Sequence, residues 1–590
     1  MDEVKARYYQ EYISQLPQGN ITYKKINGKS YPYYQWTQDG KQRSRIVKPE
    51  ELDDLKQKIE QRKVLEKKLR DENIPIIVEE YQYLSSVLVG NELLDFVNPI
   101  KDFKKRECYK DLHNYVYGNS IDKVFILYGL RRTGKTTLIK QLIYDMDESI
   151  FSKTAFMKMD SSINLAKINI DLKNLSKRGY KYIFIDEVTL MEDFIEGAAL
   201  FSDIYAASGM KIVLSGTDSL GFLFSEDREL FDRCYMVHTT FIPYREFTNV
   251  LGVNSIDNYI KYGGTMSLSG NNYNLPTSFR NEQATDEYID SAIAHNIQHS
   301  LKNYQYGNHF RHLSDLYEAN ELTSVINRVV EHENKKFTIG VLTKTFVSSD
   351  FSLTAKNLIK DRNNPTDILY LVDKEKITEW FRKELSILNK PEMTVEITNA
   401  HVAEINEYLK LLDLIIDIDI VNMIDLNKKE YQTVISQPGM RYAQAKALVE
   451  ALVKDKLFQT ISAKDRAYVT ERMLSTIEGK IMEDIILLET QMAHQNCEVF
   501  KLKFAVGEFD MVIYNPQTIS CEIFEIKHSD EVHPNQYRHL TDEQKLKETE
   551  FRYGDITRRC VIYNGESHIE NGIEYINVEE YLMFKNAIQI

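Results

Sequence analysis

The 590-residue chain is poor in cysteine and contains no long apolar run. Its five cysteines are far apart and form no CxxC pair, which argues against a zinc cluster or a disulfide framework and favours a reducing cytoplasm. No apolar run approaches the roughly 18–20 residues that a membrane-spanning helix requires. The first residues contain no apolar segment of the kind found in secretory signals. We therefore expect a cytoplasmic protein without a membrane partner.

The chain also lacks an overall positive charge, since its formal net charge is −14 at pH 7. This balance argues against a protein that coats nucleic acid non-specifically, but it is compatible with a local basic face. Residues 1–70 depart from the average, with 16 Lys and Arg against 10 Asp and Glu. The composition is typical of a soluble, folded protein, and the length predicts about three to five domains.

Residues 129–136, GLRRTGKT, match the P-loop pattern G-x-x-x-x-G-K-[ST] without a mismatch. The run VFILY before them predicts a buried strand, and TLIKQLIYDM after them has helical spacing. Backbone N–H groups at the start of such a helix bind phosphate, while Lys135 reaches the β- and γ-phosphates and Thr136 ligates Mg²⁺. The expected ATP-binding residues are Gly129, Arg132, Thr133, Gly134, Lys135, Thr136 and Thr137.

Residues 181–187, KYIFIDE, predict a buried strand that ends in two acids. We expect Asp186 to hold Mg²⁺ through its water shell and Glu187 to polarise the attacking water. The next predicted strand ends in SGTDS, where Ser215 is the expected γ-phosphate sensor and Thr217 is the nearest alternative.

Arg228 and Arg233, in SEDRELFDRCY, are candidates for an arginine finger that acts on a neighbouring subunit. Such a role would require a homo-oligomer. An ordinary surface or salt-bridged arginine is the competing interpretation of either residue.

The segments GLRRTGKTT, YIFIDE, VLSGTDS, LFDRCYMVHTTFIPYREF and YIKYGG together resemble the prokaryotic AAA-type ATPases. The resemblance is to the group with a carboxy-terminal nuclease-like domain (the DUF4143-type group), and it covers residues 120–265 well and the rest loosely. It implies a five-stranded parallel core, a helical lid and a winged helix, with recognition helix and wing at residues 396–422. Because that helix carries more acids than bases, we expect it to be structural or regulatory.

Three acids and a lysine near the carboxy terminus suggest metal-dependent phosphodiester cleavage. Glu483 lies in a predicted helix, EGKIMEDIILLET, and Asp510 lies on a predicted strand, GEFDMVIY. Glu525 and Lys527 are two positions apart in CEIFEIKHS, so strand alternation turns both to one face. Carboxylates on two adjacent strands can hold one or two Mg²⁺ ions, and the lysine can orient water and stabilise the developing charge.

This D-x₁₄-E-x-K arrangement, with an acid on the preceding helix, resembles the PD-(D/E)xK nuclease superfamily. The resemblance implies that Asp510 and Glu525 ligate Mg²⁺ or Mn²⁺, that Lys527 is the catalytic lysine and that Glu483 is the helix acid. A degenerate binding domain and a chance match are the competing interpretations, because E-x-K is a short pattern.

Two further positions of the superfamily pattern are the proline before the aspartate and a glutamine after the lysine. The proline that usually precedes the aspartate is Phe509 in this chain. The glutamine that some members carry could be Gln536 or Gln544, and the sequence does not choose between them.

Residues 20–48 predict short strands in which four tyrosines and a tryptophan are interspersed with seven basic residues. A charged helix is expected after Pro49, up to about residue 73. Aromatic and basic residues on a small sheet suit nucleic-acid binding, and the segment is similar to the arm-type DNA-binding modules of some recombinases. The competing interpretation is that the aromatic residues form the core of a minimal sheet.

We therefore predict an α/β protein in which an ATPase is fused to a metal-dependent nuclease that acts on DNA, in mobile-element biology or defence against foreign DNA. The alternatives are a nucleotide-dependent switch or scaffold with an inactive nuclease-like domain, and an ATPase that acts on proteins. The expected domains are a basic and aromatic β module (1–75), a P-loop core (76–250), a helical lid (251–335), a winged-helix region (336–465) and a restriction-endonuclease-like α/β domain (466–590).

Overall fold

In the computed structural model, the chain folds into two compact units. The first comprises residues 1–128 and 134–237, and the second comprises residues 129–133 and 238–590. Among the described residues, we find no helical segment with both the length and the apolar character that crossing a bilayer demands. The described residues are 3–26, 29–38, 41–74, 82–191, 193–217, 221–223, 229–266, 279–294, 297, 301, 310–347, 376, 379–380, 383–384, 396–425, 428–458, 462–532 and 536–584.

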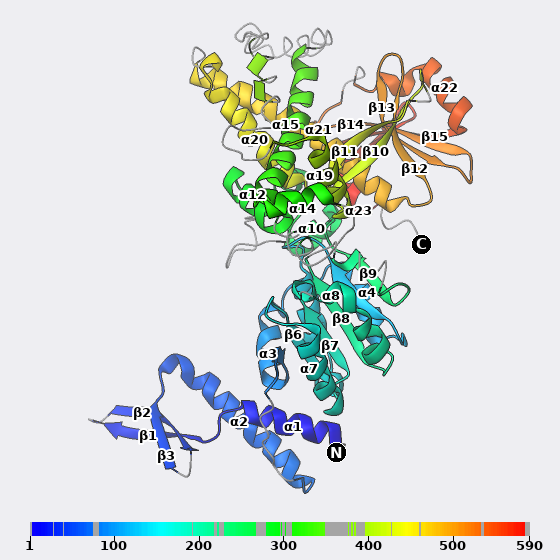
Figure 1. The fold of residues 1–590 in the computed structure, drawn as a ribbon. Helices are drawn as coiled ribbons and strands as arrows, with labels where there is room; N and C mark the ends of the chain where they lie inside the picture. The colour runs from blue at the N-terminus through cyan, green and yellow to red at the C-terminus, as the bar shows by residue number, and fades with distance from the viewer. Residues whose placement is uncertain are drawn as a thin grey trace. The chain divides into compact units, whose positions relative to one another are not determined.

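The first unit begins with a helix, a small sheet and a second helix, and the two helices lie beside each other (Figure 1). The elements are α1 (Glu3–Gln15), β1 (Asn20–Ile26), β2 (Lys29–Gln38), β3 (Lys41–Ile46) and α2 (Pro49–Asp71). The three strands are antiparallel in the order β1-β2-β3. α2 begins at a proline, with acidic residues in its first turn and basic residues in its last, which complements the helix dipole. These strands and the start of this helix agree with the sequence prediction.

The strand before the P-loop lies in a six-stranded sheet with the order β4-β6-β7-β8-β5-β9. The strands are β4 (Ser86–Leu88), β5 (Val124–Tyr128), β6 (Thr154–Lys158), β7 (Tyr182–Asp186), β8 (Lys211–Gly216) and β9 (Cys234–His238). β6, β7, β8 and β5 are parallel neighbours, whereas β4 is antiparallel to β6. The resemblance implied five parallel strands; the described pairings establish four. Because β8 separates β5 from β7, the carboxyl ends of these three strands lie side by side.

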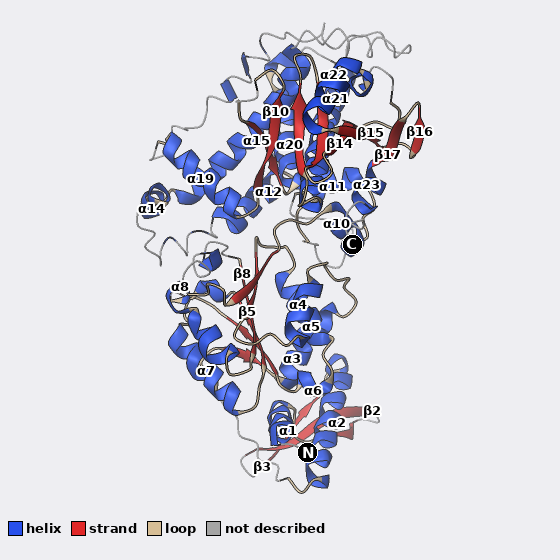
Figure 2. Cartoon of the chain, turned by 90° about the vertical axis from the view of Figure 1, so that its right-hand side faces the viewer, coloured by secondary structure: helices blue, strands red, loops and turns tan. Residues whose placement is uncertain are grey.

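Helices pack on this sheet through apolar faces. Figure 2 shows α7 on one side of the strands and α3, α4 and α5 on the other. The helices of the first unit are α3 (Gly90–Val97), η1 (Asn98–Ile100), α4 (Tyr109–Tyr117), α5 (Lys135–Tyr144), α6 (Glu148–Phe151), α7 (Leu165–Lys177), η2 (Val188–Leu190), α8 (Phe194–Gly197) and η3 (Phe201–Ala206). The sheet and the helices α3, α4 and α5 share one buried apolar cluster.

The second unit is built from helices and a mixed eight-stranded sheet, ordered β11-β10-β12-β13-β14-β15-β17-β16. Its strands are β10 (Ile415–Asn422), β11 (Glu430–Ile435), β12 (Glu498–Lys503), β13 (Glu508–Asn515), β14 (Ser520–Lys527), β15 (Asp555–Tyr563), β16 (His568–Glu570) and β17 (Ile573–Asn577). Its helices are α10 (Tyr244–Leu251), α11 (Ile256–Tyr262), α12 (Glu282–Ile289), η4 (Asp290–Ala294), α14 (Arg311–Glu318), α15 (Leu322–Val347), α19 (Asn399–Leu411), α20 (Pro438–Lys454), η5 (Lys456–Phe458), α21 (Ala463–Ala493), η7 (Arg538–Thr541), α22 (Glu543–Tyr553) and α23 (Val578–Phe584).

The predicted winged-helix region is not a separate module in the described residues. Its helix, α19, is followed by the antiparallel β10–β11 hairpin, and β10 pairs in parallel with β12. The hairpin therefore extends the sheet that carries Asp510 and Glu525, and the expected boundary at 465/466 runs through this sheet. The physical reason is that the pairing of β10 with β12 joins segments about 80 residues apart, as the register of Ile420 with Lys501 shows.

The long helix α21 fixes the position of Glu483 over the sheet. Its N-cap is Ser462, whose side chain accepts a hydrogen bond from the backbone N–H of Asp465. α21 contacts α20 and the strands β10, β11, β12 and β14. Ile477, Ile481 and Ile485, spaced by one helical turn, lie in one buried cluster with apolar residues of the sheet. Figure 2 shows the blue helices α20 and α21 beside the red strands.

Candidate nucleotide site and candidate nuclease-like site

The P-loop connects β5 to α5 through backbone conformations that favour glycine. Gly129 has a φ of 137° and Gly134 a φ of 90°. A Cβ atom at Gly129 would lie 2.7 Å from the Thr239 hydroxyl, so no larger residue fits without movement. Gly134 is the N-cap of α5, which leaves the first N–H groups of this helix without partners inside it. Such a helix N-terminus suits a phosphate group.

The first half of the P-loop is held by residues that follow β9. The backbone N–H of Leu130 donates to the Thr240 hydroxyl at 3.1 Å. The hydroxyls of Thr133 and Thr239 share a hydrogen bond of 2.7 Å, and Thr133 also donates to the Leu130 carbonyl at 2.9 Å. Thr133 is fully buried by these contacts. Its hydroxyl therefore has a structural role in shaping the loop.

Arg132 also contributes to the loop through its backbone. It adopts a left-handed conformation with a φ of 64°, and its carbonyl accepts a hydrogen bond of 2.7 Å from the N–H of Met266. A non-glycine residue in this region is uncommon and costs conformational free energy. The contact with Met266 helps to hold it there.

The first turn of α5 faces the end of β7. The Thr136 hydroxyl donates to Asp186 Oδ2 at 2.8 Å, and the Ser215 hydroxyl donates to Asp186 Oδ1 at 2.5 Å. Lys135 precedes Thr136 and is buried, and Thr137 follows in the same turn. A hydroxyl beside a carboxylate is a donor set that Mg²⁺ prefers, so these residues fit the ion that accompanies ATP.

Glu187 follows Asp186 in a left-handed backbone conformation, with a φ of 56°. The Thr217 hydroxyl donates to Glu187 Oε2 at 3.2 Å. The sequence offered Ser215 and Thr217 as alternative sensors; the structure brings Ser215 to Asp186 and Thr217 to Glu187. Asp218 lies outside the described residues.

Of the two arginine-finger candidates, only Arg233 lies among the described residues. Arg233 is exposed and forms an ion pair of 3.2 Å with Asp203, within the first unit. This contact corresponds to the salt-bridged interpretation that competed with the finger. Arg228 lies outside the described residues.

The predicted nuclease residues Asp510, Glu525 and Lys527 are brought together in the second unit. Antiparallel pairing of Met511 with Phe524 places Asp510 opposite Glu525. Lys527 Nζ lies 2.9 Å from Asp510 Oδ2 and 2.7 Å from Glu525 Oε2. The backbone N–H of Ile526 donates to Asp510 Oδ2 at 2.8 Å. One ammonium group therefore bridges two buried carboxyl groups.

Burial and these charges set the protonation of the cluster. Burial, together with the charge of Asp510, raises the pKa of Glu525 to about 9 against the attraction of Lys527. Burial also raises the pKa of Asp510, but Lys527 and Lys501 outweigh it and hold that pKa below its ordinary value. Burial lowers the pKa of Lys527, but the two carboxyl groups outweigh it, so that pKa is above its ordinary value. At neutral pH the Asp510–Lys527 ion pair thus stands beside a protonated Glu525.

Glu483 is held by two lysines that the sequence prediction missed. Its Oε1 atom contacts Lys480 Nζ at 2.5 Å and also accepts a hydrogen bond from Lys501 on β12. Lys501 also lies 3.4 Å from Glu508. Lys480 could have been found, because it stands one turn before Glu483 on a predicted helix. Lys501 is a buried lysine inside an apolar strand, but its partner depends on how α21 packs.

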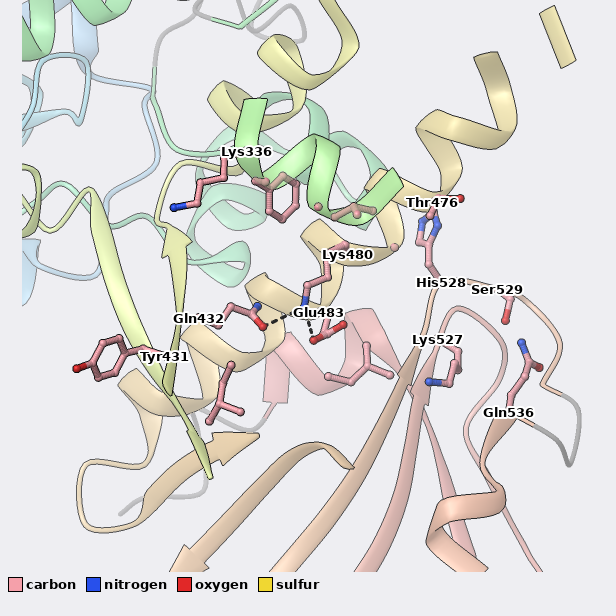
Figure 3. A pocket seen from close by; sticks show the side chains of 16 residues that line it. Lys336, Tyr431, Gln432, Thr476, Lys480, Glu483, Lys527, His528, Ser529 and Gln536 are labelled. Atoms are coloured by element: carbon pink, nitrogen blue, oxygen red, sulfur yellow. Dashed lines mark hydrogen bonds and ion pairs between the residues drawn. The ribbon is translucent and has the colours of Figure 1, made fainter. Parts of the chain in front are cut away.

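A cavity of about 530 Å³ opens beside these residues (Figure 3). Figure 3 shows Glu483 between Lys480 and Lys527, with Gln432 on one side and Gln536 on the other. Gln536 lines this cavity, whereas Gln544 lines a different one. Of the two glutamine candidates, the structure brings only Gln536 to the wall that includes Lys527. Other lining residues that sequence reasoning missed are Lys336, Thr476, His528 and Ser529.

The carboxyl groups fit a metal ion only in part. Glu525 Oε1 is buried and has no hydrogen-bonding partner among the described residues. This oxygen could therefore bind a cation. Glu483 is instead neutralised by its lysines. Within the same residues, no group of three or more His, Cys, Asp and Glu side chains is placed to hold a metal ion. The pair Asp510 and Glu525 is therefore the part of the predicted set that fits.

Comparisons with known proteins identify two segments. Residues 121–248 match the family described as AAA domain, and residues 1–57 match a domain of unknown function (DUF6788). No curated protein matches the chain.

Two solved structures are weakly similar. Hsp104 of S. cerevisiae in complex with casein is 13% identical over 50% of this chain and 58% of its own, with a TM-score of 0.26. The ORC1 protein of Aeropyrum pernix in complex with DNA is 12% identical over 61% of this chain and 97% of its own, with a TM-score of 0.23. The chain thus spans little more than half of Hsp104, and neither similarity is high enough to bear on its fold or function. The matched family and the P-loop geometry together make residues 121–248 an AAA-type P-loop ATPase domain that uses ATP with a divalent metal ion.

Proposed function

We propose that the protein couples its ATPase domain to a metal-dependent nuclease that acts on DNA. One observation carries this proposal. Lys527 Nζ lies within hydrogen-bonding distance of both Asp510 and Glu525, and the three residues lie on two adjacent strands. Two carboxyl groups and a lysine at one point of a sheet are the groups that metal-assisted phosphodiester cleavage needs. Both carboxyl groups are buried, so their arrangement is enforced by the surrounding fold.

Each group of the cluster has a distinct part in this proposal. Asp510 and Glu525 would hold Mg²⁺ or Mn²⁺, and the bound ion would supply Lewis acidity and an activated water. Lys527 Nζ lies within hydrogen-bonding distance of both carboxyl groups, so it can orient a water or a phosphate oxygen once a cation takes its place on them. Gln536 lines the same cavity and can donate to a second phosphate oxygen.

The ATPase residues would control when this chemistry takes place. In this proposal Lys135 and the start of α5 bind the phosphates, and Thr136 and Asp186 hold Mg²⁺. Glu187 polarises the attacking water, and Ser215 reports the γ-phosphate to Asp186. ATP turnover would then gate or position the nuclease-like sheet on DNA, as part of mobile-element biology or defence against foreign DNA.

A second candidate function is favoured by one specific observation. Glu483, the acid expected on the helix, is engaged by Lys480 and Lys501 and not by the Asp510–Glu525 pair. A buried carboxylate with two ammonium partners is neutralised, so it has little tendency to bind a cation. This arrangement suits a switch or scaffold in which the nuclease-like fold binds nucleic acid or a partner without cutting.

A cleavage assay separates the two candidates. Plasmid and single-stranded DNA are incubated with Mg²⁺ or Mn²⁺, with and without ATP, and wild type is compared with Asp510→Ala. Cutting that this substitution abolishes supports the ATPase-nuclease, and Glu187→Gln should then alter it. The absence of cutting in every condition, with ATP hydrolysis intact, supports the switch or scaffold.

A further inference from the structure

The amino-terminal sheet has two faces with different surroundings. Strand register places Ile21, Tyr34 and Arg45 in one row on one face, and Thr22, Tyr33 and Ile46 in one row on the other. We call these the helix-side face and the open face. By the same register, the open face includes Thr22, Lys24, Tyr31, Tyr33, Gln35, Ser44 and Ile46.

The helix-side face provides the core of this small module. Ile21 and Tyr34 pack against Val47, Leu55 and Ile59, the last two on α2. On the same face, Arg45 donates to Glu51 of α2 at 2.8 Å, and the Tyr34 ring stacks on Trp36 with centroids 4.9 Å apart. The core interpretation of the aromatic residues therefore applies to Tyr34.

The open face has the opposite character. Ile46 is 51% exposed, and Lys24 and Ser44 are also exposed. Tyr31 and Tyr33 are only partly buried and lie two positions apart on the central strand, so their rings emerge from the same side. Lys24 Nζ lies 4.5 Å from the centre of the Tyr33 ring, in a cation–π contact. This face thus presents aromatic rings and polar groups to solvent.

The charge of the segment that forms the sheet favours an anionic partner. Residues 20–48 contain seven Lys and Arg but one acidic residue, Asp39, in a chain whose net charge is −14. Lys24 and Lys25 lie on the edge strand β1, and Arg43 and Arg45 lie on the other edge strand, β3. Of these four, Lys24 belongs to the open face, whereas Lys25, Arg43 and Arg45 belong to the helix-side face. Tyr31 and Tyr33 on β2 therefore have Lys24 beside them on their own face and lie between two edge strands that both carry basic residues. A partner that is both polyanionic and rich in flat rings is complementary to this arrangement.

We propose that the open face binds single-stranded nucleic acid, with bases stacked on Tyr31 and Tyr33 and the backbone following the basic edges. A single strand is favoured over a duplex because its bases are free to stack on aromatic side chains. The inference concerns a surface that the ATPase and the nuclease-like cluster do not use, and it does not rest on the proposed function.

The test uses the full-length protein in EDTA and without nucleotide, so that neither ATP turnover nor metal-dependent cleavage contributes. Fluorescence anisotropy follows the binding of labelled oligo(dT) and oligo(U) of about 20 nucleotides, and of a duplex of the same length, at several salt concentrations. Tyr31→Ala and Tyr33→Ala should each raise Kd roughly fivefold to a hundredfold, the loss expected for one stacked base. Tyr33→Phe should restore binding, because the ring is kept.

Two matched controls lie in the same module. Tyr23 is 56% exposed but points to the helix-side face, so Tyr23→Ala should leave Kd nearly unchanged. Lys24→Gln should weaken binding and reduce the salt dependence more than Lys25→Gln, its neighbour on the other face. Equal losses for Tyr23→Ala and Tyr33→Ala, with circular dichroism unchanged, would overturn the assignment of the face. A wild-type protein that binds neither oligonucleotide, or binds only the duplex, overturns the proposal itself.

Discussion

Ser215 donates a hydrogen bond of 2.5 Å to Asp186, which ends the neighbouring strand. The contact exists because β8 lies between β5 and β7 in the sheet. It fixes one oxygen of Asp186, while Thr136 occupies the other at 2.8 Å. The carboxylate at the expected metal position is therefore oriented from two sides before any ligand binds, which is the preorganisation that catalysis requires.

Removing the Ser215 hydroxyl should slow ATP hydrolysis more than it weakens ATP binding. A hydrogen bond to a charged group contributes about 1.5–3 kcal/mol, so Ser215→Ala is expected to lower kcat roughly tenfold to a hundredfold. Phosphate release and binding of a fluorescent ATP analogue measure the two effects. Ser208→Ala removes an exposed hydroxyl that donates to the Tyr205 carbonyl, and its activity should match wild type. A kcat unchanged by Ser215→Ala would contradict the role of this contact.

Glu187→Gln should retain ATP while it abolishes turnover. Glu187 is held by Thr217 at 3.2 Å, beside the Asp186 carboxylate. The amide keeps the shape but cannot accept a proton, and a general base contributes about 10²–10⁴-fold to the rate. Isothermal titration with Mg–ATP should give a Kd within about threefold of wild type, since Thr136 and Lys135 are untouched. Hydrolysis near the wild-type rate would exclude Glu187 as the base.

Local sequence patterns were sufficient for the ATPase elements. The apolar runs at β5, β7 and β8 predicted buried strands, because a parallel strand covered on both faces must be apolar throughout. The P-loop pattern carries its own backbone requirements, and Gly129 and Gly134 have the positive φ values that it demands.

Local patterns were insufficient where distant segments meet. Residues 415–422, IIDIDIVN, show an extended strand but not its pairing with β12, which begins at Glu498. Spacing likewise indicated Asp510, Glu525 and Lys527, since E-x-K on one strand shares a face. It could not show that Lys501 reaches Glu483, because that contact depends on the packing of α21 against β12.

Arg441→Met should destabilise the second unit by about 3–5 kcal/mol, the loss expected when one partner of a buried ion pair is removed. Arg441 donates to Asp484 at 2.7 Å, and both side chains are almost fully buried. Thermal unfolding should show a clearly lower transition. The control is Lys446→Met on the same helix. The Lys446 side chain is exposed, and its Nζ atom lies 3.9 Å from Glu450, so this ion pair contributes little to stability. The double variant Arg441→Met with Asp484→Leu should recover most of the loss, because no unpaired charge is left buried.

Glu525→Gln should stabilise the metal-free protein, and more so as pH rises. The pKa of Glu525 in the folded protein, about 9, lies above the ordinary value of 4.5. The folded protein therefore keeps a proton that the unfolded chain releases, so the free energy of unfolding falls as pH rises from about 4.5 to about 9. A neutral amide removes this fall.

In EDTA, the melting temperature of the variant should exceed that of wild type by at least about 2 °C near pH 9, with a smaller gap near pH 6. Glu543→Gln, on the surface of α22, should show no such trend. A gap that is constant or shrinks with pH would mean that Glu525 is already ionised, because the charge of Lys527 then outweighs burial and Asp510.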